Sequence, residues 1–80
     1  LVPLALGRSV VVARRWDGRR DREALVLVDR ATGATLATLE RPARPSFVVA
    51  IARDVIYTAR AQDGVEAMTE RGELLWRLPW

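Results

Sequence analysis

The fold is decided by residues 25–39, which read Leu25-Val26-Leu27-Val28-Asp29-Arg30-Ala31-Thr32-Gly33-Ala34-Thr35-Leu36-Ala37-Thr38-Leu39. Short apolar runs at the start and end of this stretch flank a polar segment, and both runs suit β-strands. Asp29 can accept hydrogen bonds from the backbone amides that follow it, and Gly33 tolerates the positive φ of a tight turn. The stretch therefore predicts a β-hairpin that spans Glu23–Glu40.

Short strands are also expected on both sides of this hairpin. Apolar runs alternate with turn residues along the chain, and helical spacing nowhere explains the pattern better than strands do. Pro3 cannot donate to a hydrogen-bond ladder, so the first run is expected at a sheet edge or a bulge. Asp17-Gly18 readily supplies the positive φ angles of a hairpin turn. Arg41–Ser46 holds two prolines and predicts a connector that does not continue a strand.

The same pattern of strands and turns occurs twice. Residues 1–18 align with residues 47–64 at an offset of 46, which superposes the two Asp-Gly turns. The later halves align at an offset of 39, which places Gly33 on Gly72, and a longer loop at 19–23 explains the difference. Two units with a period of about 40 residues are typical of propeller-type repeats.

The two repeats resemble the blades of β-propellers. Residues 27–34, Leu27-Val28-Asp29-Arg30-Ala31-Thr32-Gly33-Ala34, are similar to the V-D-x-x-T-G hairpin between the outer strands of such blades. In the second repeat, a series similar to the D-x-V-Y, D-G and G-x-x-x-W run of quinoprotein-like blades is formed by Asp54-Val55-Ile56-Tyr57, Asp63-Gly64 and Gly72-Glu73-Leu74-Leu75-Trp76. The six-bladed propellers of bacterial extracytoplasmic proteins are equally similar.

The resemblance implies an all-β chain of two four-stranded antiparallel blades. The expected divisions are a first blade-like repeat at 1–40, a connector at 41–46 and a second repeat at 47–80. The apolar blade faces are expected to pack through residues 10–12, 25–28, 48–51 and 55–57. Two blades are fewer than the roughly four to eight that close a propeller ring, and open apolar faces are sticky. We therefore expect a fragment of a larger propeller, with Pro3 and Pro79 near the divisions between blades, or a subunit of an assembled ring.

The composition narrows the possible chemistry. The chain has no Cys and no His, which removes disulfides, thiolates and the commonest general base and transition-metal ligand. All 13 basic residues are Arg, against 10 acidic residues, and the net charge of +3 is small for a surface that binds nucleic acid. No run approaches the roughly 18 uninterrupted apolar residues of a membrane-spanning helix.

One cluster has the chemistry of a partner site. Guanidinium groups beside an aromatic ring can hold a phosphate or a stacked base, so a small Arg-rich nucleic-acid-binding β domain stays open as one alternative. Asp17, Asp21 and Glu23 are interleaved with the arginines and neutralise most of their charge, which favours a solvated loop. The candidate anion or partner contacts are Arg14, Arg15, Trp16, Arg19, Arg20 and Arg22.

The other acidic residues have structural interpretations. Asp29, Asp54 and Asp63 fall at predicted turns, where an Asp side chain satisfies nearby backbone amides. Glu66, Glu70 and Glu73 are expected to point outward from edge strands, where their charges deter edge-to-edge aggregation.

The sequence therefore predicts a structural or interaction module with no catalytic site, cofactor or metal of its own. In quinoprotein-like enzymes many blades together hold the cofactor, a metal ion and a catalytic Asp, and none of that set falls on a residue of this chain. Ala37 also stands where the repeat would place a match for Trp76.

The expected partners are the remaining blades or identical subunits, with a protein bound through loops as a further expectation. Neither a membrane span nor a nucleic-acid partner is expected. A further alternative is a fragment of a propeller enzyme, lactonase or quinoprotein-like, whose active site lies in other blades. The resemblance alone favours an extracytoplasmic compartment.

Overall fold

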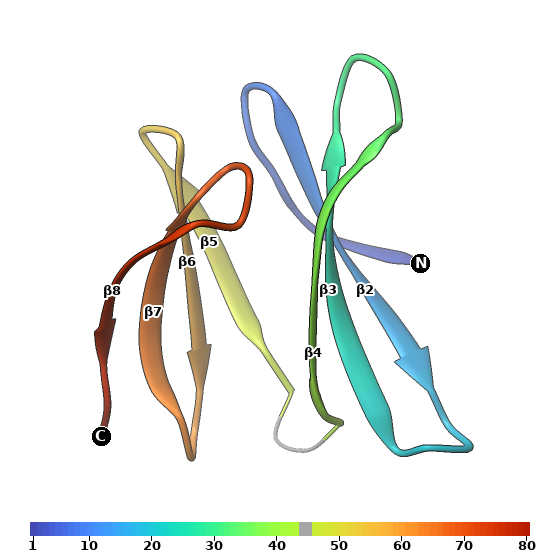
Figure 1. Ribbon diagram of the computed structural model, residues 1–80, viewed down its shortest axis with the longest axis vertical. Helices are drawn as coiled ribbons and strands as arrows, with labels where there is room; N and C mark the ends of the chain where they lie inside the picture. Colours follow the sequence, from blue (N-terminus) through green and yellow to red (C-terminus); the bar gives the residue numbers. More distant parts are fainter. Residues whose placement is uncertain (44–45) are drawn as a thin grey trace.

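The computed structural model describes residues 1–43 and 46–80, and every regular element in them is a β-strand (Figure 1). They form two four-stranded antiparallel sheets, which confirms the predicted fold class. The first, here called the N-sheet, contains β1 (Val2–Leu6), β2 (Val10–Asp17), β3 (Arg22–Asp29) and β4 (Thr35–Pro42). The second, the C-sheet, contains β5 (Val48–Ala52), β6 (Val55–Arg60), β7 (Gly64–Thr69) and β8 (Leu74–Leu78). Of the expected connector, Arg44 and Pro45 lie outside the described residues.

The strands of each sheet pair in the order of the sequence, β1-β2-β3-β4 and β5-β6-β7-β8. β1 is therefore an edge strand, as Pro3 predicts. The pairing of β1 with β2 also shifts between Pro3 and Ala5, because Leu4 is an extra residue there. Edge position and irregular pairing are the two settings that accept a proline in a strand.

The hairpin predicted over Glu23–Glu40 is formed by β3 and β4. The backbone N–H of Asp29 donates to the carbonyl of Ala34 at 2.7 Å, and Gly33 donates back to the carbonyl of Asp29 at 2.8 Å. The Asp29 carboxylate accepts from the amides of Ala31 and Thr32, and Gly33 has a φ of 77°. The local turn chemistry in the sequence therefore fixes this connection.

The expectation that Arg41 and Pro42 could not continue a strand was wrong. β4 extends to Pro42, which pairs with Arg22. β4 is an edge strand and Pro42 is its last residue, so the missing N–H of the proline costs little.

The hairpin between β2 and β3 forms at the predicted place, but its geometry differs from the prediction. β2 runs through Asp17 and β3 begins at Arg22, so the turn is confined to residues 18–21, and Arg22 and Glu23 of the expected loop belong to β3. The positive φ of this turn falls at Asp21, with a value of 49°, and not at Gly18. Asp17 accepts a hydrogen bond from the Arg19 amide at 3.1 Å, as its turn interpretation predicts.

The two sheets share one hydrophobic core, and β1 lies against β5. The surface of each sheet that contributes to this core is called its joining face, and the opposite surface its outer face. The fully buried core residues of the N-sheet are Val10, Val12, Leu25 and Leu27, and the buried core residues of the C-sheet are Ile56 and Met68.

The segments 10–12, 25–28, 48–51 and 55–57 were expected to pack between the sheets. Only every second residue of these segments reaches the core. Side chains point to opposite faces of a strand in turn, so Val11 and Val28 lie on the outer face of the N-sheet. Val48 and Tyr57 lie likewise on the outer face of the C-sheet.

Both sheets carry the same irregularity in the same place. The pairing shifts at Leu27–Val28 in the N-sheet and at Ala67–Met68 in the C-sheet. Each shift is followed by a polar residue, Asp29 or Thr69, whose side-chain oxygen accepts backbone hydrogen bonds from the next turn. Leu27 and Ala67 are therefore structurally equivalent.

This shared geometry corrects the alignment of the two repeats. Val10 pairs with Asp29, and Val55 pairs with Thr69, an offset of 45 between β2 and β6 where the sequence predicted 46. The extra residue Leu4 causes the difference. A shift of one residue exchanges the faces of a strand. The joining face of the N-sheet is thus equivalent to the outer face of the C-sheet, and the sheets stack head to tail.

Candidate interaction site

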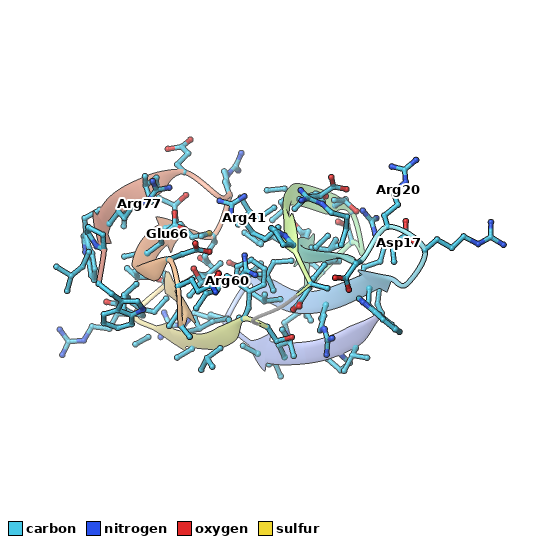
Figure 2. All side chains as sticks on the ribbon, turned by 90° about the horizontal axis from the view of Figure 1, so that it is seen from below. Asp17, Arg20, Arg41, Arg60, Glu66 and Arg77 are labelled. Atoms are coloured by element: carbon cyan, nitrogen blue, oxygen red, sulfur yellow. The ribbon has the colours of Figure 1, made fainter. Side chains whose placement is uncertain are left out.

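The six residues predicted as anion or partner contacts do not form one patch. β2 alternates, so Arg14 and Trp16 belong to the joining face, whereas Arg15 pairs with Ala24 on the outer face. Arg19 and Arg20 lie in the turn that follows β2, and Figure 2 shows Arg20 beside Asp17 at the periphery of the molecule. The cluster seen in the sequence is therefore divided between two faces and a turn.

Most of these arginines already face carboxylates. Arg15 lies 3.8 Å from Glu40, and Arg20 lies 3.9 Å from Asp17. A hollow of about 260 Å³ on this part of the N-sheet is lined by Arg15, Asp17, Arg20, Arg22, Glu23, Ala24 and Glu40. Three guanidinium groups and three carboxylates leave this hollow without a net positive charge to attract an anion.

Glu23 is the most deeply buried charged residue of this region. Its Oε1 lies 3.2 Å from Nε of Arg14, and its Oε2 accepts a hydrogen bond from Ser46 Oγ at 2.8 Å. The two contacts connect β2, β3 and the segment that leads into the C-sheet. A carboxylate held in this way positions the chain. Glu23 was expected in a solvated loop, so its burial was not predicted.

A second charged group joins the two sheets and was missed by the sequence analysis (Figure 2). Glu66 was expected to point outward from an edge strand, and that expectation was wrong. β7 is an inner strand, and the Glu66 side chain is only 13% exposed. Its carboxylate lies 3.9 Å from Arg41 of the N-sheet and 3.1 Å from Arg77 of the C-sheet. Arg77 and, from the neighbouring sheet, Arg41 together provide the positive charge that compensates this burial.

Arg60 makes the second polar connection between the sheets. Its side chain is 5% exposed and donates a hydrogen bond to the carbonyl of Pro42 at 2.6 Å. The guanidinium also lies 3.1 Å from Asp63 and 5.0 Å from the ring centroid of Phe47. Asp63 thus pairs with an arginine and does more than close its turn.

Arg41, Arg60 and Arg77 line a hollow of about 440 Å³ at this end of the sheets, together with Asp63 and Glu66. Each of the three guanidinium groups contacts one of these two carboxylates. The hollow therefore belongs to the joint between the sheets.

The outer face of the C-sheet is an uncovered apolar surface. Val48 is 70% exposed and Leu78 is 57% exposed, and Trp76 packs on Tyr57 with 6.1 Å between ring centroids. Among the described residues, the strands place no charged side chain on this face. Its strand residues are Val48, Ala50, Ala52, Val55, Tyr57, Ala59, Val65, Ala67, Thr69, Trp76 and Leu78.

The outer face of the N-sheet is apolar at the end that holds Leu6 and Val28, whereas Arg15, Asp17 and Arg22 occupy its other end. Leu6 is 64% exposed and pairs with Val11, and the half-buried Val28 continues the face, while Val26 beside it is only 4% exposed. A shallow hollow of about 300 Å³ is lined by Pro3, Leu4, Ala5, Leu6 and Val11. Two apolar faces, one at each end of the stack, are thus the surfaces with the clearest capacity to bind a partner.

No protein-family model matches this chain. No curated protein and no solved structure matches it at a significant level either. Within residues 1–43 and 46–80, no group of three or more His, Cys, Asp or Glu residues could hold a metal ion. The same residues contain no helix long and apolar enough to cross a membrane.

Proposed function

We propose that this chain is a pair of β-propeller-type blades that serves as a structural or interaction module. Its outer faces are covered by further blades or by identical subunits. The observation that carries the proposal is the head-to-tail stacking of the sheets, in which equivalent faces point the same way. Such stacking leaves a free face at each end and continues until a ring closes, which is how propellers are arranged.

The nature of the free surfaces supports a protein partner. The outer face of the C-sheet is apolar and carries aromatic side chains, which are common at the centres of protein interfaces. The arginine cluster supports a nucleic-acid partner poorly, because Arg14, Arg15 and Arg20 each face a carboxylate.

The proposal is tested with an apolar dye that fluoresces on exposed hydrophobic surfaces. We expect strong binding by the folded chain at concentrations where it is monomeric, and a clearly weaker signal when Val48→Lys and Leu78→Lys are combined, with the remainder due to the outer face of the N-sheet. Circular dichroism confirms that the variant remains folded. A folded monomer that binds no dye would contradict the proposal, since its outer faces would then need no cover.

A further inference from the structure

We infer that the outer face of the C-sheet binds a second copy of this chain, which docks with the outer face of its N-sheet. This inference rests on the proposed function and names the partner. The outer face of the C-sheet is equivalent to the joining face of the N-sheet, and the outer face of the N-sheet is equivalent to the joining face of the C-sheet. The new interface therefore repeats the interface that already joins the two sheets inside the chain. Four contacts of the internal joint can be translated into contacts between copies.

The first translated contact is the hydrophobic centre. Inside the chain, Val12 and Leu27 pack in the core with Ile56 and Met68 of the C-sheet. Between copies, Tyr57 and Ala67 of one C-sheet take the places of Val12 and Leu27. Val11 and Val28 of the other copy's N-sheet take the places of Ile56 and Met68. All four replacements are apolar or aromatic. Ala67 is already covered within the chain, so the half-buried Tyr57, Val11 and Val28 provide the surface that a second copy would bury.

The second contact joins the turns at one end of the sheets. Ser9 Oγ donates a hydrogen bond to Glu70 Oε2 at 2.7 Å, which links the two sheets. The equivalent of Ser9 is Asp54, and the equivalent of Glu70 is Arg30. The neutral hydrogen-bond donor and its carboxylate are thus replaced by an acid and a base. Between copies they form a complementary charge pair.

The third contact concerns the space between a glycine turn and the strand that it faces. A Cβ placed on Gly72 would lie 2.8 Å from the Cβ of Ala37, so the turn after β7 presses on β4 of the N-sheet. The equivalent residues are Gly33 and Trp76. A Cβ on Gly33 meets nothing within 4 Å in the chain itself. Between copies, the large Trp76 side chain therefore meets an open glycine turn.

In the fourth contact, both residues of a charged pair are replaced between copies. Arg41 and Glu66 form an ion pair across the internal joint, with 3.9 Å between their charged atoms. The position equivalent to Glu66 holds Val26, and the sequence position equivalent to Arg41 is Trp80, which lies two residues beyond β8 and donates its indole N–H to the Arg60 carbonyl at 2.7 Å. Both partners of this ion pair are replaced by apolar residues, so the exchange leaves neither charge without its partner.

Repetition of one packing operation in one sense generates a ring when the rotation closes. Propeller rings contain about four to eight blades. With two sheets in each chain, the assembly is expected to contain about two to four copies.

The test of self-association introduces a charged residue on one outer face at a time. Leu78→Glu places a charge on the outer face of the C-sheet, and Leu6→Glu places one on the outer face of the N-sheet. Both leucines are exposed in the single chain, so the fold of each variant is expected to survive. Ala61→Glu, in the exposed turn between β6 and β7, is the matched control. Circular dichroism verifies folding, and sedimentation velocity measures the mass.

The native chain and the Ala61→Glu variant are expected to form an oligomer of about two to four copies. Each single-face variant is expected to be monomeric, with association weakened at least about a hundredfold, because a carboxylate would be buried without a partner. An equal mixture of the two variants retains one intact pair of faces and is expected to form a heterodimer that grows no further.

Four results would overturn the inference. A dimer formed by either variant alone would indicate symmetric contact of like faces. A mixture that stays monomeric would rule out the head-to-tail contact. A native chain that is monomeric, folded and strongly dye-binding would also exclude self-association, while leaving the proposed function in place. A native monomer that binds no dye would contradict both.

Discussion

Arg60 donates a hydrogen bond to the carbonyl of Pro42 at 2.6 Å, and this contact ties the last strand of the N-sheet to the second strand of the C-sheet. The donor is a buried guanidinium and the acceptor is a backbone carbonyl, so the contact is of the stronger, charge-assisted kind. Asp63 balances the charge from the turn that follows β6. The joint between the sheets therefore depends on polar contacts as well as on its apolar centre.

Replacement of Arg60 by Met is expected to lower the free energy of unfolding by about 2 kcal/mol, since it removes a hydrogen bond from a charged donor and leaves Pro42 unsatisfied. Urea denaturation at constant m-value measures the change. The matched control is Arg71→Met in the exposed turn after β7, which is expected to change stability by less than about 0.5 kcal/mol. Equal effects of the two substitutions would show that Arg60 does not contribute through its buried contacts.

Removal of Arg14 is expected to destabilise the chain more than removal of the whole Arg14–Glu23 pair. Arg14→Met leaves the buried Glu23 carboxylate with only Ser46 as a partner, at an expected cost of about 3 kcal/mol. The double variant Arg14→Met/Glu23→Leu removes the stranded charge and is expected to recover part of that loss. Thermal unfolding of the three proteins provides the comparison, and a double variant less stable than Arg14→Met would refute it.

Gly72→Ala is expected to destabilise the chain more than Gly33→Ala. Both glycines have a positive φ, which costs an alanine about 1–2 kcal/mol. Only Gly72 also faces a side chain, the Cβ of Ala37, and the added overlap is expected to cost at least about 1 kcal/mol more. Ala37→Gly should therefore relieve Gly72→Ala but leave Gly33→Ala unchanged. Equal losses in the two single variants would show that the turn after β7 does not press on β4.

Exchange of the charges at Asp54 and Arg30 is expected to control association between copies. Asp54→Arg and Arg30→Glu each place like charges in the interface, and each should weaken association several-fold at low salt. In an equal mixture, every contact between unlike variants again joins opposite charges, so association should return toward the native level. Sedimentation equilibrium at two salt concentrations measures the effect. Failure of the mixture to recover would mean that the two turns do not meet.

The strands and their order were predictable because they depend on local information. Alternating side chains and turn residues such as Asp29 and Gly33 act within a few positions, and the structure follows them. The register of the repeat was not predictable, since the extra residue Leu4 changes which face a side chain occupies without altering the hydrophobic pattern.

The candidate site was less accessible to sequence reasoning because its contacts join distant segments. Glu66 looks like a solvent-facing residue until Arg41 of the other sheet is placed beside it. Arg14 and Arg15 look like one cluster until the strand that holds them sends them to opposite faces. The spacing of 14 and 23 across the β2–β3 hairpin was the one signal that could have brought Arg14 near Glu23.

The pairing of every strand with its neighbour along the sequence also has a consequence for biogenesis. No strand of the N-sheet waits for a partner from the second half of the chain, and local pairings of this kind form early and fast. The ladder of the first sheet can therefore be complete while the second sheet is still being synthesised, and the apolar joining face of the N-sheet stays uncovered until β5, β6 and β7 have emerged.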